Sequence, residues 1–374
     1  MPFLIIHFAM KFSLLSAIAL FAAAATAQTN NAIADIDYGA RSLKEAAEAD
    51  DTELVRECHK QNDNYIPSLK AGQYSTSAFH NCFRTSDQIY EFIDTLVIQN
   101  PKLLSKFAIS KSYKNATIYG YKLSKGNSQS LYFQALQHAR EWIAGSSILF
   151  SFASILDDIA NNKPTAADEY DLYFVPIVNI DSYALTWNGT RFQRKNANEV
   201  DLNRNWPTPF KNPKTRTKKH GDYPGLKTFS EPETEGINEW LQSKRSEIQG
   251  FLDIHAYGAY ILYAFADTEE PIGGGIDEKF EVLGRGLQSA MGEPYIQKSA
   301  HEFYLAYGVF PDYAFREFKK PALTIEIFGE GFTANVSTIQ ARGLEVYKGI
   351  NQFAKEVTVF NSGDVTPTKP SCGD

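Results

Sequence analysis

The chain has 374 residues, of which 43% are hydrophobic and 22% charged, so it can bury a large core and does not have the composition of a disordered protein. Its formal net charge of −7 argues against nucleic acid as a main partner. The length fits one large α/β domain with extensions at its ends. A basic cluster over 211–219 is interpreted as a solvated loop.

The N-terminus has the pattern of a secretory signal peptide. Met10-Lys11 precedes an apolar run over 12–25, and Ala25-Thr26-Ala27 is a small-x-small cleavage pattern. We therefore expect residues 1–27 to be removed after Ala27, with Met10 as an alternative start of translation. Because the apolar run is too short for a stable membrane span, we expect a secreted, extracellular protein with no membrane association.

Three cysteines and three glycosylation sequons fit an oxidising, extracellular environment. Cys58 and Cys82 are the cysteines closest in sequence and could form a disulfide, but with Cys372 three pairings are open. The sequons begin at Asn115, Asn188 and Asn335.

Residues 28–75 are polar and show little periodicity, apart from a short helix expected over 43–55. Because so short a segment has little core of its own, it is interpreted as a pro-segment or an N-terminal extension. Cleavage near 70–75 is one way in which it could be removed, and whether it inhibits anything is open.

From residue 76 to residue 358 the pattern alternates between helices and strands, which predicts a single α/β domain with a mostly parallel or mixed sheet. Helices are expected over 86–99, with Ser86 as the N-cap, 143–159, 231–248, after a Ser230–Glu233 capping box, 280–291 and 337–357. Strands are expected over 117–123, 131–136, 172–178, 251–254, 261–265 and 322–328. Residues 359–374 form a polar tail.

A candidate metal site begins at Gln137-His138-Ala139-Arg140-Glu141-Trp142, where a strand gives way to a helix. Residues three apart lie on one side of a first helical turn, so His138 and Glu141 can converge on one point. The same pair is also common as a strand-end histidine and a favourable charge at a helix N-terminus. His255 ends another strand and is the natural third ligand, because sites in open α/β sheets lie beyond the strands' carboxyl ends. Two histidines and one glutamate are a catalytic zinc set.

Two further features place polar groups in ordered surroundings. The stretch Asp201-Leu202-Asn203-Arg204 is either a surface turn or a loop in which Arg204 grips a carboxylate and Asp201 orients a ligating imidazole. Glu326 lies in an apolar strand, where it is either a structural ion-pair partner or a general base.

These motifs, together with Tyr304-Leu305-Ala306-Tyr307-Gly308, resemble the zinc metallocarboxypeptidases of the carboxypeptidase A type over most of the chain, from Phe79 to Val357. The resemblance implies a mixed eight-stranded sheet flanked by helices and one Zn²⁺ bound by His138, Glu141 and His255. It implies Glu326 as the general base and Arg194 as the group that stabilises the oxyanion. The substrate-binding residues that it implies are Arg140, Arg191, Asn203, Arg204, Tyr257, Tyr304 and Pro311.

The resemblance predicts a secreted, monomeric exopeptidase that acts on the C-termini of peptides or proteins. Its implied pocket for the terminal side chain carries no charge, which predicts a preference for apolar or aromatic C-terminal residues. A slip of one residue would place Asp312 in that pocket and reverse this prediction. The residues implied to line the pocket are Leu262, Ala306, Val309, Pro311 and Thr324.

Two alternative functions remain open from the sequence. One is a catalytically inactive secreted binding protein on the same fold, although such a protein would be expected to lose Glu326 or a metal ligand. The other is a zinc amidase that acts on small N-acyl amino acids. Arg204 and Tyr304 argue for a peptide carboxylate without excluding such substrates.

Overall fold

The computed structural model describes residues 50–211 and 216–363, which all belong to one compact unit. The expected signal peptide, residues 364–374 of the polar tail with Cys372, and most of the helix expected over 43–55 lie outside the described residues. Residues 359–362 of the expected tail instead continue the last helix, α9 (Ile339–Ser362). Within them, the first helix, α2, spans Thr52–Asn62.

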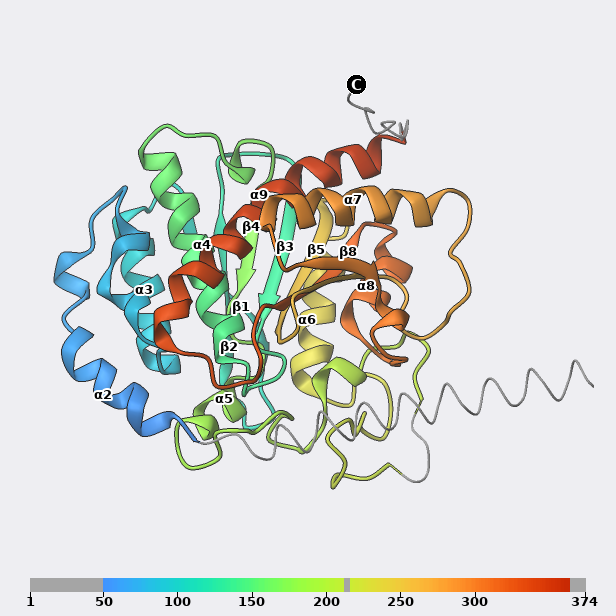
Figure 1. Ribbon diagram of the computed structural model, residues 1–374, viewed down its shortest axis with the longest axis horizontal. Helices are drawn as coiled ribbons and strands as arrows, with labels where there is room; N and C mark the ends of the chain where they lie inside the picture. Colours follow the sequence, from blue (N-terminus) through green and yellow to red (C-terminus); the bar gives the residue numbers. More distant parts are fainter. Residues whose placement is uncertain (1–49, 212–215, 364–374) are drawn as a thin grey trace, which may run out of the picture. The chain divides into compact units, whose positions relative to one another are not determined.

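A mixed sheet forms the centre of this unit (Figure 1). Eight strands are described, in the spatial order β1-β2-β4-β3-β5-β8-β6-β7, and the four central strands β4, β3, β5 and β8 are parallel. The predicted fold class is therefore confirmed. The strands are β1 (Leu104–Lys111), β2 (Thr117–Leu123), β3 (Ser130–Ala135), β4 (Asp171–Val175), β5 (Ile248–Ala256), β6 (Tyr260–Tyr263), β7 (Ile296–Ser299) and β8 (Ala322–Ile327).

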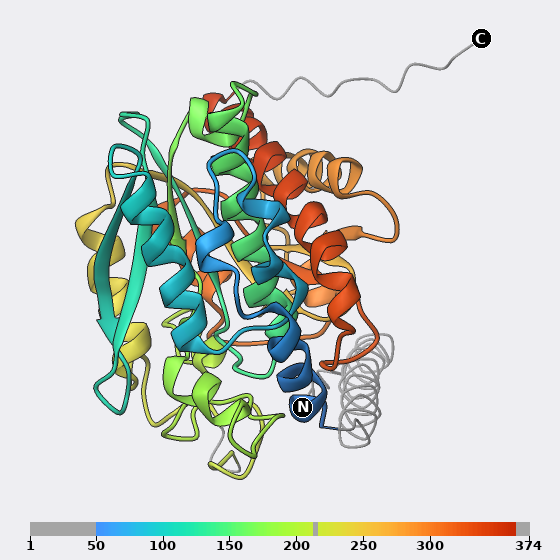
Figure 2. The ribbon, with the colours of Figure 1, turned by 90° about the vertical axis from the view of Figure 1, so that its left-hand side faces the viewer.

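Helices cover both faces of the sheet. On β4, Tyr173 packs against Trp240 of α6 with ring centroids 4.8 Å apart, whereas its neighbour Phe174 packs against Phe152 of α4 at 5.0 Å. Successive side chains of a strand point to opposite faces, so α6 and α4 lie on opposite sides of the sheet (Figure 2). The helices after α2 are α3 (Ser86–Gln99), α4 (Trp142–Ala160), α5 (Ile180–Thr186), α6 (Pro232–Ser243), α7 (Ile276–Met291), α8 (Phe310–Phe318) and α9 (Ile339–Ser362).

Helix α4 is a core helix. It is long and apolar enough to span a membrane by composition, but 83% of its most apolar window is buried inside the protein. Helices α4, α9 and α7 pack beside one another over one face of the sheet (Figure 1). This packing explains why α4 is hydrophobic nearly all round.

Two helix starts differ from the sequence predictions. Thr85, not Ser86, is the N-cap of α3, because the Thr85 hydroxyl accepts the N–H of Gln88 in a capping box. The capping box expected at the start of α6 does not form. Its N-cap is Glu231, which makes no side-chain cap, and the Ser230 hydroxyl donates to the Glu231 carboxylate instead (2.8 Å).

Strands β1 and β7 and helices α5 and α8 were not predicted. β7 has no buried residue, so its sequence carries no apolar alternation. It becomes a strand by pairing with β6 in parallel register. Such short elements form through tertiary contacts rather than through intrinsic propensity.

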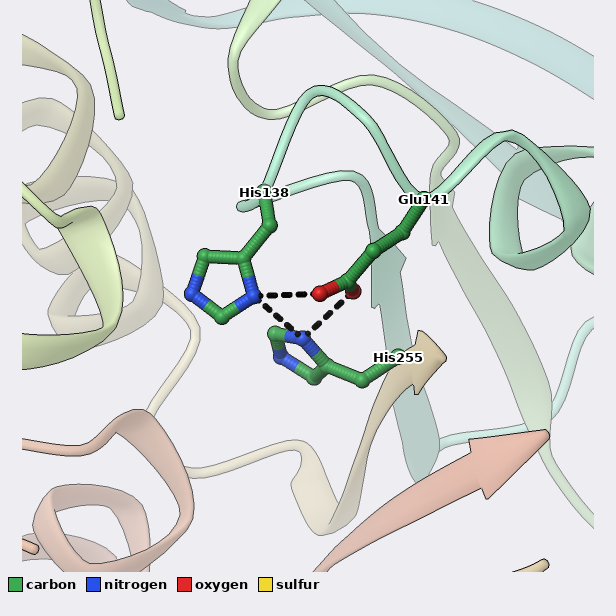
Figure 3. Close-up of side chains that lie close together, drawn as sticks. All are labelled: His138, Glu141 and His255. Atoms are coloured by element: carbon green, nitrogen blue, oxygen red, sulfur yellow. Dashed lines mark hydrogen bonds and ion pairs between the residues drawn. The ribbon is translucent and has the colours of Figure 1, made fainter. Parts of the chain in front are cut away.

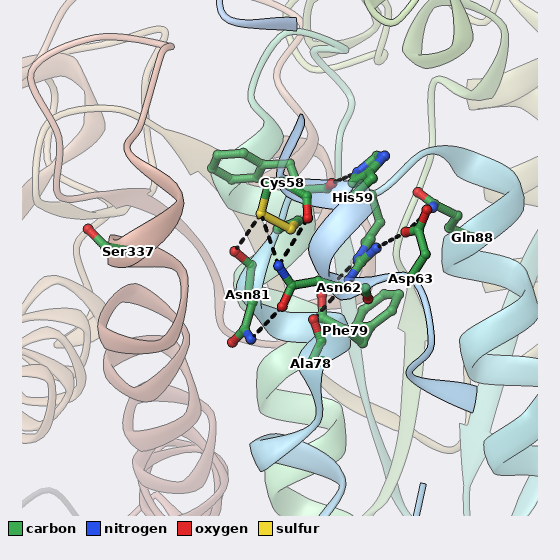
Figure 4. Close-up of a disulfide and its surroundings, with 12 residues drawn as sticks. Cys58, His59, Asn62, Asp63, Ala78, Phe79, Asn81, Gln88 and Ser337 are labelled. Carbon is green, nitrogen blue, oxygen red and sulfur yellow. Dashed lines mark hydrogen bonds and ion pairs between the residues drawn. A yellow bond between two sulfur atoms is a disulfide. The ribbon is translucent and has the colours of Figure 1, made fainter. Parts of the chain in front are cut away.

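The segment 50–75 is built into the compact unit. Val55, Tyr65 and Tyr74 are buried members of the main hydrophobic core. Cys58 and Cys82 form a disulfide, which decides among the pairings left open by the sequence (Figure 4). The boundary expected at residue 75 therefore falls inside the compact unit rather than at its edge.

Candidate metal centre

His138 and Glu141 lie on the short loop that joins β3 to α4. Glu141 is the N-cap of α4, so the pair is not held in the first helical turn as the sequence analysis expected. The chain leaves β3 through Leu136, whose φ is 58°, and then forms a turn in which the N–H of Glu141 donates to the carbonyl of His138 (3.3 Å). His255 is the second-last residue of β5, at the carboxyl end of a central strand.

The three side chains converge on one point (Figure 3). His138 Nδ1 lies 2.8 Å from Glu141 Oε1, His255 Nδ1 lies 3.0 Å from Glu141 Oε2, and the two Nδ1 atoms lie 3.0 Å apart. All three residues are buried, and their potential ligand atoms lie within 4.8 Å of one another. The three sequence-predicted ligands therefore form one cluster.

Each imidazole has an aspartate carboxylate as the hydrogen-bond partner of its Nε2. Asp201 Oδ1 lies 3.1 Å from His138 Nε2, and Asp253 Oδ2 lies 2.9 Å from His255 Nε2. A carboxylate that accepts the Nε2–H of a histidine leaves its Nδ1 lone pair directed at the common point. Asp201 was expected in this role, whereas Asp253 was not.

The electrostatics of the cluster favour a bound cation. Burial alone would lower the pKa of His255, but Asp253 and Glu141 raise it well above its ordinary value. Burial would likewise raise the pKa of Glu141, but His138 and His255 hold it below its ordinary value. Two converging imidazoles and three buried carboxylates fit the ligand chemistry and charge of Zn²⁺.

Arg194 borders the metal cluster. Its guanidinium binds Asp201 Oδ2 through Nε (3.0 Å) and Nη2 (2.8 Å), and Nη1 lies 3.9 Å from Glu141 Oε1. Burial would raise the pKa of Asp201, but Arg194, followed by His138, lowers it well below its ordinary value. Arg194 is thus a positive group fixed at the edge of the centre.

Glu326 reaches the same site from the neighbouring strand. In the parallel register of β5 and β8, Glu326 pairs with His255. Register partners point to the same face of a sheet, so the Glu326 carboxylate lies on the face that carries the metal ligands.

A cavity that opens to solvent adjoins Glu326. At its rim Arg204 Nη2 donates to the hydroxyl of Tyr304 (3.0 Å), and Asn203 accepts the N–H of Phe310 through its side chain (2.8 Å). Gly308 permits this arrangement, since its φ is 69° and a Cβ there would lie 2.2 Å from Arg204 O. The apolar residues around the cavity include Leu262, Ala266, Ala306, Val309 and Pro311.

Asp312 also contributes to the cavity lining, beside Pro311. Its Oδ2 accepts the N–H of Ala266 (2.8 Å), and Arg316, which binds Asp267 through both terminal nitrogens, lies 4.0 Å away. Burial, followed by the negative charge of Asp267, raises the pKa of Asp312 to about 7. The charge-free lining implied by the resemblance is therefore incomplete at this point.

Not every implied substrate-binding residue lies at the cavity. Arg140 stacks on Phe332, with Cζ 3.8 Å from the ring centroid, and Tyr257 meets the same ring edge-on at 5.1 Å. Arg191 is 2% exposed, and its guanidinium nitrogens bind Asp51 and two backbone carbonyls. The structure therefore places Arg191 inside the protein rather than at the cavity.

Sequence reasoning missed Asp253 and Phe332. Asp253 had a signal, because a residue two positions before His255 lies on the same face of the strand. Phe332 had none, since the loop after β8 has no periodicity and only the fold brings it to Arg140.

The chain was compared with known proteins. A family model described as zinc carboxypeptidase matches residues 89–349. Carboxypeptidase A1 of Rattus norvegicus is 30% identical over 241 residues, covering 59% of this chain and 55% of that protein. Carboxypeptidase A1 of Bos taurus is 27% identical over 296 residues, which cover 74% of this chain and 70% of that protein. The chain thus spans only about half the length of some of the curated relatives that it matches.

Solved structures show the same fold. Carboxypeptidase A from Helicoverpa armigera superposes with a TM-score of 0.71 at 21% identity, covering 83% of this chain and 81% of that one. Bovine thrombin-activatable fibrinolysis inhibitor, solved with a tick carboxypeptidase inhibitor, superposes with a TM-score of 0.69 at 23% identity. The match covers 75% of this chain and 99% of that one. Because the family model matches well over half of the chain, the resemblance noted in the sequence is confirmed: the chain belongs to the zinc carboxypeptidase family.

Proposed function

We propose that this protein is a zinc-dependent exopeptidase that hydrolyses the C-terminal peptide bond of peptides or proteins. The observation that carries the proposal is the position of Glu326, between a three-residue metal cluster and a cavity rimmed by Arg204 and Tyr304. The rim would bind the terminal carboxylate and the cavity would receive the terminal side chain. The peptide bond that precedes this residue would then lie at the metal centre, where it is cut.

The rim would hold the substrate's terminal carboxylate. The guanidinium of Arg204 offers a planar pair of N–H donors, and Tyr304 and Asn203 add further hydrogen-bond donors. Burial would lower the pKa of Arg204, but Tyr304, followed by Asp201, raises it, so the guanidinium stays charged. This requirement for a free carboxylate makes the enzyme an exopeptidase.

The metal would be held by His138, Glu141 and His255. When bound there, zinc supplies a Lewis acid that polarises the scissile carbonyl and lowers the pKa of a water. Glu326 takes a proton from the attacking water and passes it to the leaving amine. Arg194 stabilises negative charge that develops on the scissile oxygen.

The cavity supports a preference for apolar or aromatic C-terminal residues. Most of its wall is aliphatic, which favours an apolar side chain over a charged one. Asp312 does not act as an isolated acid, because its carboxylate accepts a backbone N–H and its pKa is raised to about 7. A terminal arginine would therefore meet a carboxyl group that already accepts a backbone N–H and is only about half ionised at pH 7.

Secretion, glycosylation and a monomeric state complete the proposal. The disulfide requires an oxidising compartment. Asn115, Asn188 and Asn335, which begin the three sequons, are all exposed and thus accessible to glycosylation. The pro-segment was expected over 28–75, but residues 50–75 belong to the compact unit, so the pro-segment that we propose is limited to residues 28–49.

The test uses secreted, zinc-quantified protein with two blocked dipeptides, one ending in Phe and one in Arg. We expect chelator-sensitive release of Phe and at least tenfold slower release of Arg. Equal or faster release of Arg would contradict the apolar preference while leaving the zinc chemistry in place. An N-acyl amino acid is tested beside the dipeptides to distinguish the exopeptidase from the amidase alternative. The amidase alternative predicts that the N-acyl amino acid is the better substrate.

Failure to release any of a wider panel of C-terminal residues, from folded and zinc-loaded protein lacking residues 28–49, would overturn the exopeptidase assignment. The inactive binding protein would then be the better account, since it requires the same fold without turnover.

A further inference from the structure

Asn196 organises the loop that carries two groups of the metal centre. This loop runs from Arg194 to Asp201, and Asn196 is fully buried within it. The backbone N–H of Asn196 donates to the carbonyl of Val200 (2.9 Å), and its side-chain oxygen accepts the N–H groups of Val200 (3.0 Å) and Asn198 (3.0 Å). Both backbone polar groups of Val200, which directly precedes Asp201, are therefore bound by Asn196.

The side-chain nitrogen of Asn196 is bound by two carboxylates from another segment. Asn196 Nδ2 donates to Glu231 Oε2 (2.7 Å) and to Glu233 Oε2 (3.3 Å), and both glutamates lie at the start of α6. All three side chains are buried. The two carboxylates thus replace water as acceptors for the N–H groups of this buried amide.

The two carboxylates have neutral donors at their other oxygens. Glu231 Oε1 accepts the hydroxyl of Ser230 (2.8 Å), and Glu233 Oε1 accepts the N–H of Tyr113 (2.9 Å). Burial, and to a smaller extent the charge of Glu231, raises the pKa of Glu233 to about 7. The start of α6 therefore favours an amide donor from Asn196 and disfavours a further negative charge there.

The two carboxylates belong neither to the metal cluster nor to the cavity lining. Their contact with Asn196 still bears on the centre through the backbone, because Val200 directly precedes Asp201. Asp201 Oδ1 lies 3.1 Å from His138 Nε2. A displacement of Asn196 would move Asp201 away from His138, and the imidazole would lose the acceptor that directs its Nδ1 at the common point.

We propose that Asn196 is a positioning residue: held by the two carboxylates of α6, it keeps Asp201 against His138. The inference rests on the proposed function in one respect, namely that the centre binds zinc. It adds the start of α6, which contains no metal ligand and no residue of the cavity lining, to the parts of the chain on which zinc binding depends.

The experiment compares three variants of the secreted protein. Asn196→Asp keeps the shape and the accepting oxygen, but it places a second oxygen against two buried carboxylates. Adding Glu231→Gln presents an amide to that oxygen, so the double variant restores the contact with donor and acceptor exchanged. The control is Asn100→Asp at the end of α3, where Asn100 Nδ2 binds the Tyr74 hydroxyl (3.0 Å) and the Leu96 carbonyl (2.9 Å).

Zinc affinity is the first readout and is measured by competition with a chromophoric chelator. Asn196→Asp should weaken zinc affinity by about tenfold or more, the effect of losing the carboxylate partner of a ligating histidine. The double variant should recover to within about threefold of wild type, and Asn100→Asp should stay within about twofold. Asn196→Ser removes the same donor without adding a charge. It should weaken zinc affinity by about fivefold or more, and it carries the comparison if Asn196→Asp does not accumulate as folded protein.

The second readout is the NMR signal of each imidazole Nε2–H in protein with nitrogen-labelled histidine. The hydrogen-bonded, slowly exchanging signal of His138 should disappear in Asn196→Asp and return in the double variant. The partner of His255 Nε2 is Asp253, which lies on β5 rather than on the loop of Asn196. The His255 signal should therefore persist in every variant, and it serves as an internal control.

Wild-type zinc affinity together with an unchanged His138 signal in both Asn196 variants would overturn the inference. Loss of both imidazole signals, or a double variant no better than Asn196→Asp, would overturn it as well, because these are the results of a general loosening of the fold. If the wild-type protein binds no zinc or releases no C-terminal residue, the proposed function fails. The imidazole signals then still decide whether Asn196 positions Asp201.

Discussion

His255 and Glu326 are register partners on the adjacent parallel strands β5 and β8. One is a ligand of the candidate metal centre and the other is the proposed general base. The backbone hydrogen bonds between the two strands fix their relative position, so neither depends on a mobile loop. On the other edge of β8, Leu262 of β6 is the register partner of Thr324, which extends the same face towards the cavity.

This arrangement predicts the result of Glu326→Gln. We expect kcat to fall by a factor of about 10² to 10⁴, because the amide cannot accept a proton from water. Zinc content, measured by elemental analysis, should not change, since Glu326 is not a ligand. Glu330→Gln makes the same chemical change at an exposed position on the following loop and should retain wild-type kcat. Loss of zinc together with activity would point to a structural role instead.

The carboxylate behind His255 should control metal affinity. Asp253→Asn cannot hold the imidazole in the same way, so we expect zinc affinity to weaken by a factor of about 10 to 100. Competition with a chromophoric chelator on folded protein measures the change. The matched control is Asp94→Asn on helix α3, which alters the ion pair of Asp94 with Lys106 of β1. Equal affinities in the two variants would contradict the role of Asp253.

The cavity should set the size of the accepted side chain. Ala306→Leu adds bulk at the wall, and we expect kcat/KM for a C-terminal Phe substrate to fall about tenfold or more because the ring is excluded. A C-terminal Ala substrate should lose less than threefold, and it serves as the internal control. A parallel loss on both substrates would mean that the cavity does not receive the terminal side chain.

Asp312 predicts a pH dependence of stability. Its pKa is about 7 in the folded protein, against an ordinary value of 3.8, so between these values the folded state holds more protons than the unfolded state. The contribution of Asp312 to stability is therefore present below about pH 4 and is lost as the pH rises through 7. Urea unfolding at pH 5 and pH 8 should show a smaller loss in Asp312→Asn than in wild type, by up to roughly 3 kcal/mol. If the unfolding free energies of wild type and Asp312→Asn depended on pH in the same way, Asp312 would not contribute to the pH dependence of stability.

The Cys58–Cys82 disulfide should stabilise the whole compact unit. It closes a loop over a sequence separation of 24, and replacing both cysteines by alanine should lower the free energy of unfolding by about 3 kcal/mol. Limited proteolysis should then cut first between residues 58 and 82, since this segment loses its covalent anchor. An unfolding free energy equal to that of wild type would show that the core contacts of Tyr65 and Tyr74 suffice.

The alternating α/β architecture and the three candidate metal ligands were predictable from the sequence alone. The apolar run over 172–178 was predicted as a buried strand, and its first part belongs to β4 (Asp171–Val175), which is buried throughout. His138, Glu141 and His255 are recognisable because zinc accepts few ligand types and strand ends meet at one edge of a sheet.

The groups around that centre are set by the tertiary structure. Phe332 reaches Arg140 through loop packing that no local pattern encodes, whereas Asp253 lies two residues before His255 on β5, a spacing that a local pattern does encode. Helix α4 begins after Glu141, and a turn in which the Glu141 N–H donates to the His138 carbonyl orients the pair instead. Arg191, which sequence reasoning assigned to substrate, is turned inward by Asp51, because a buried guanidinium must find its counter-charge within the fold.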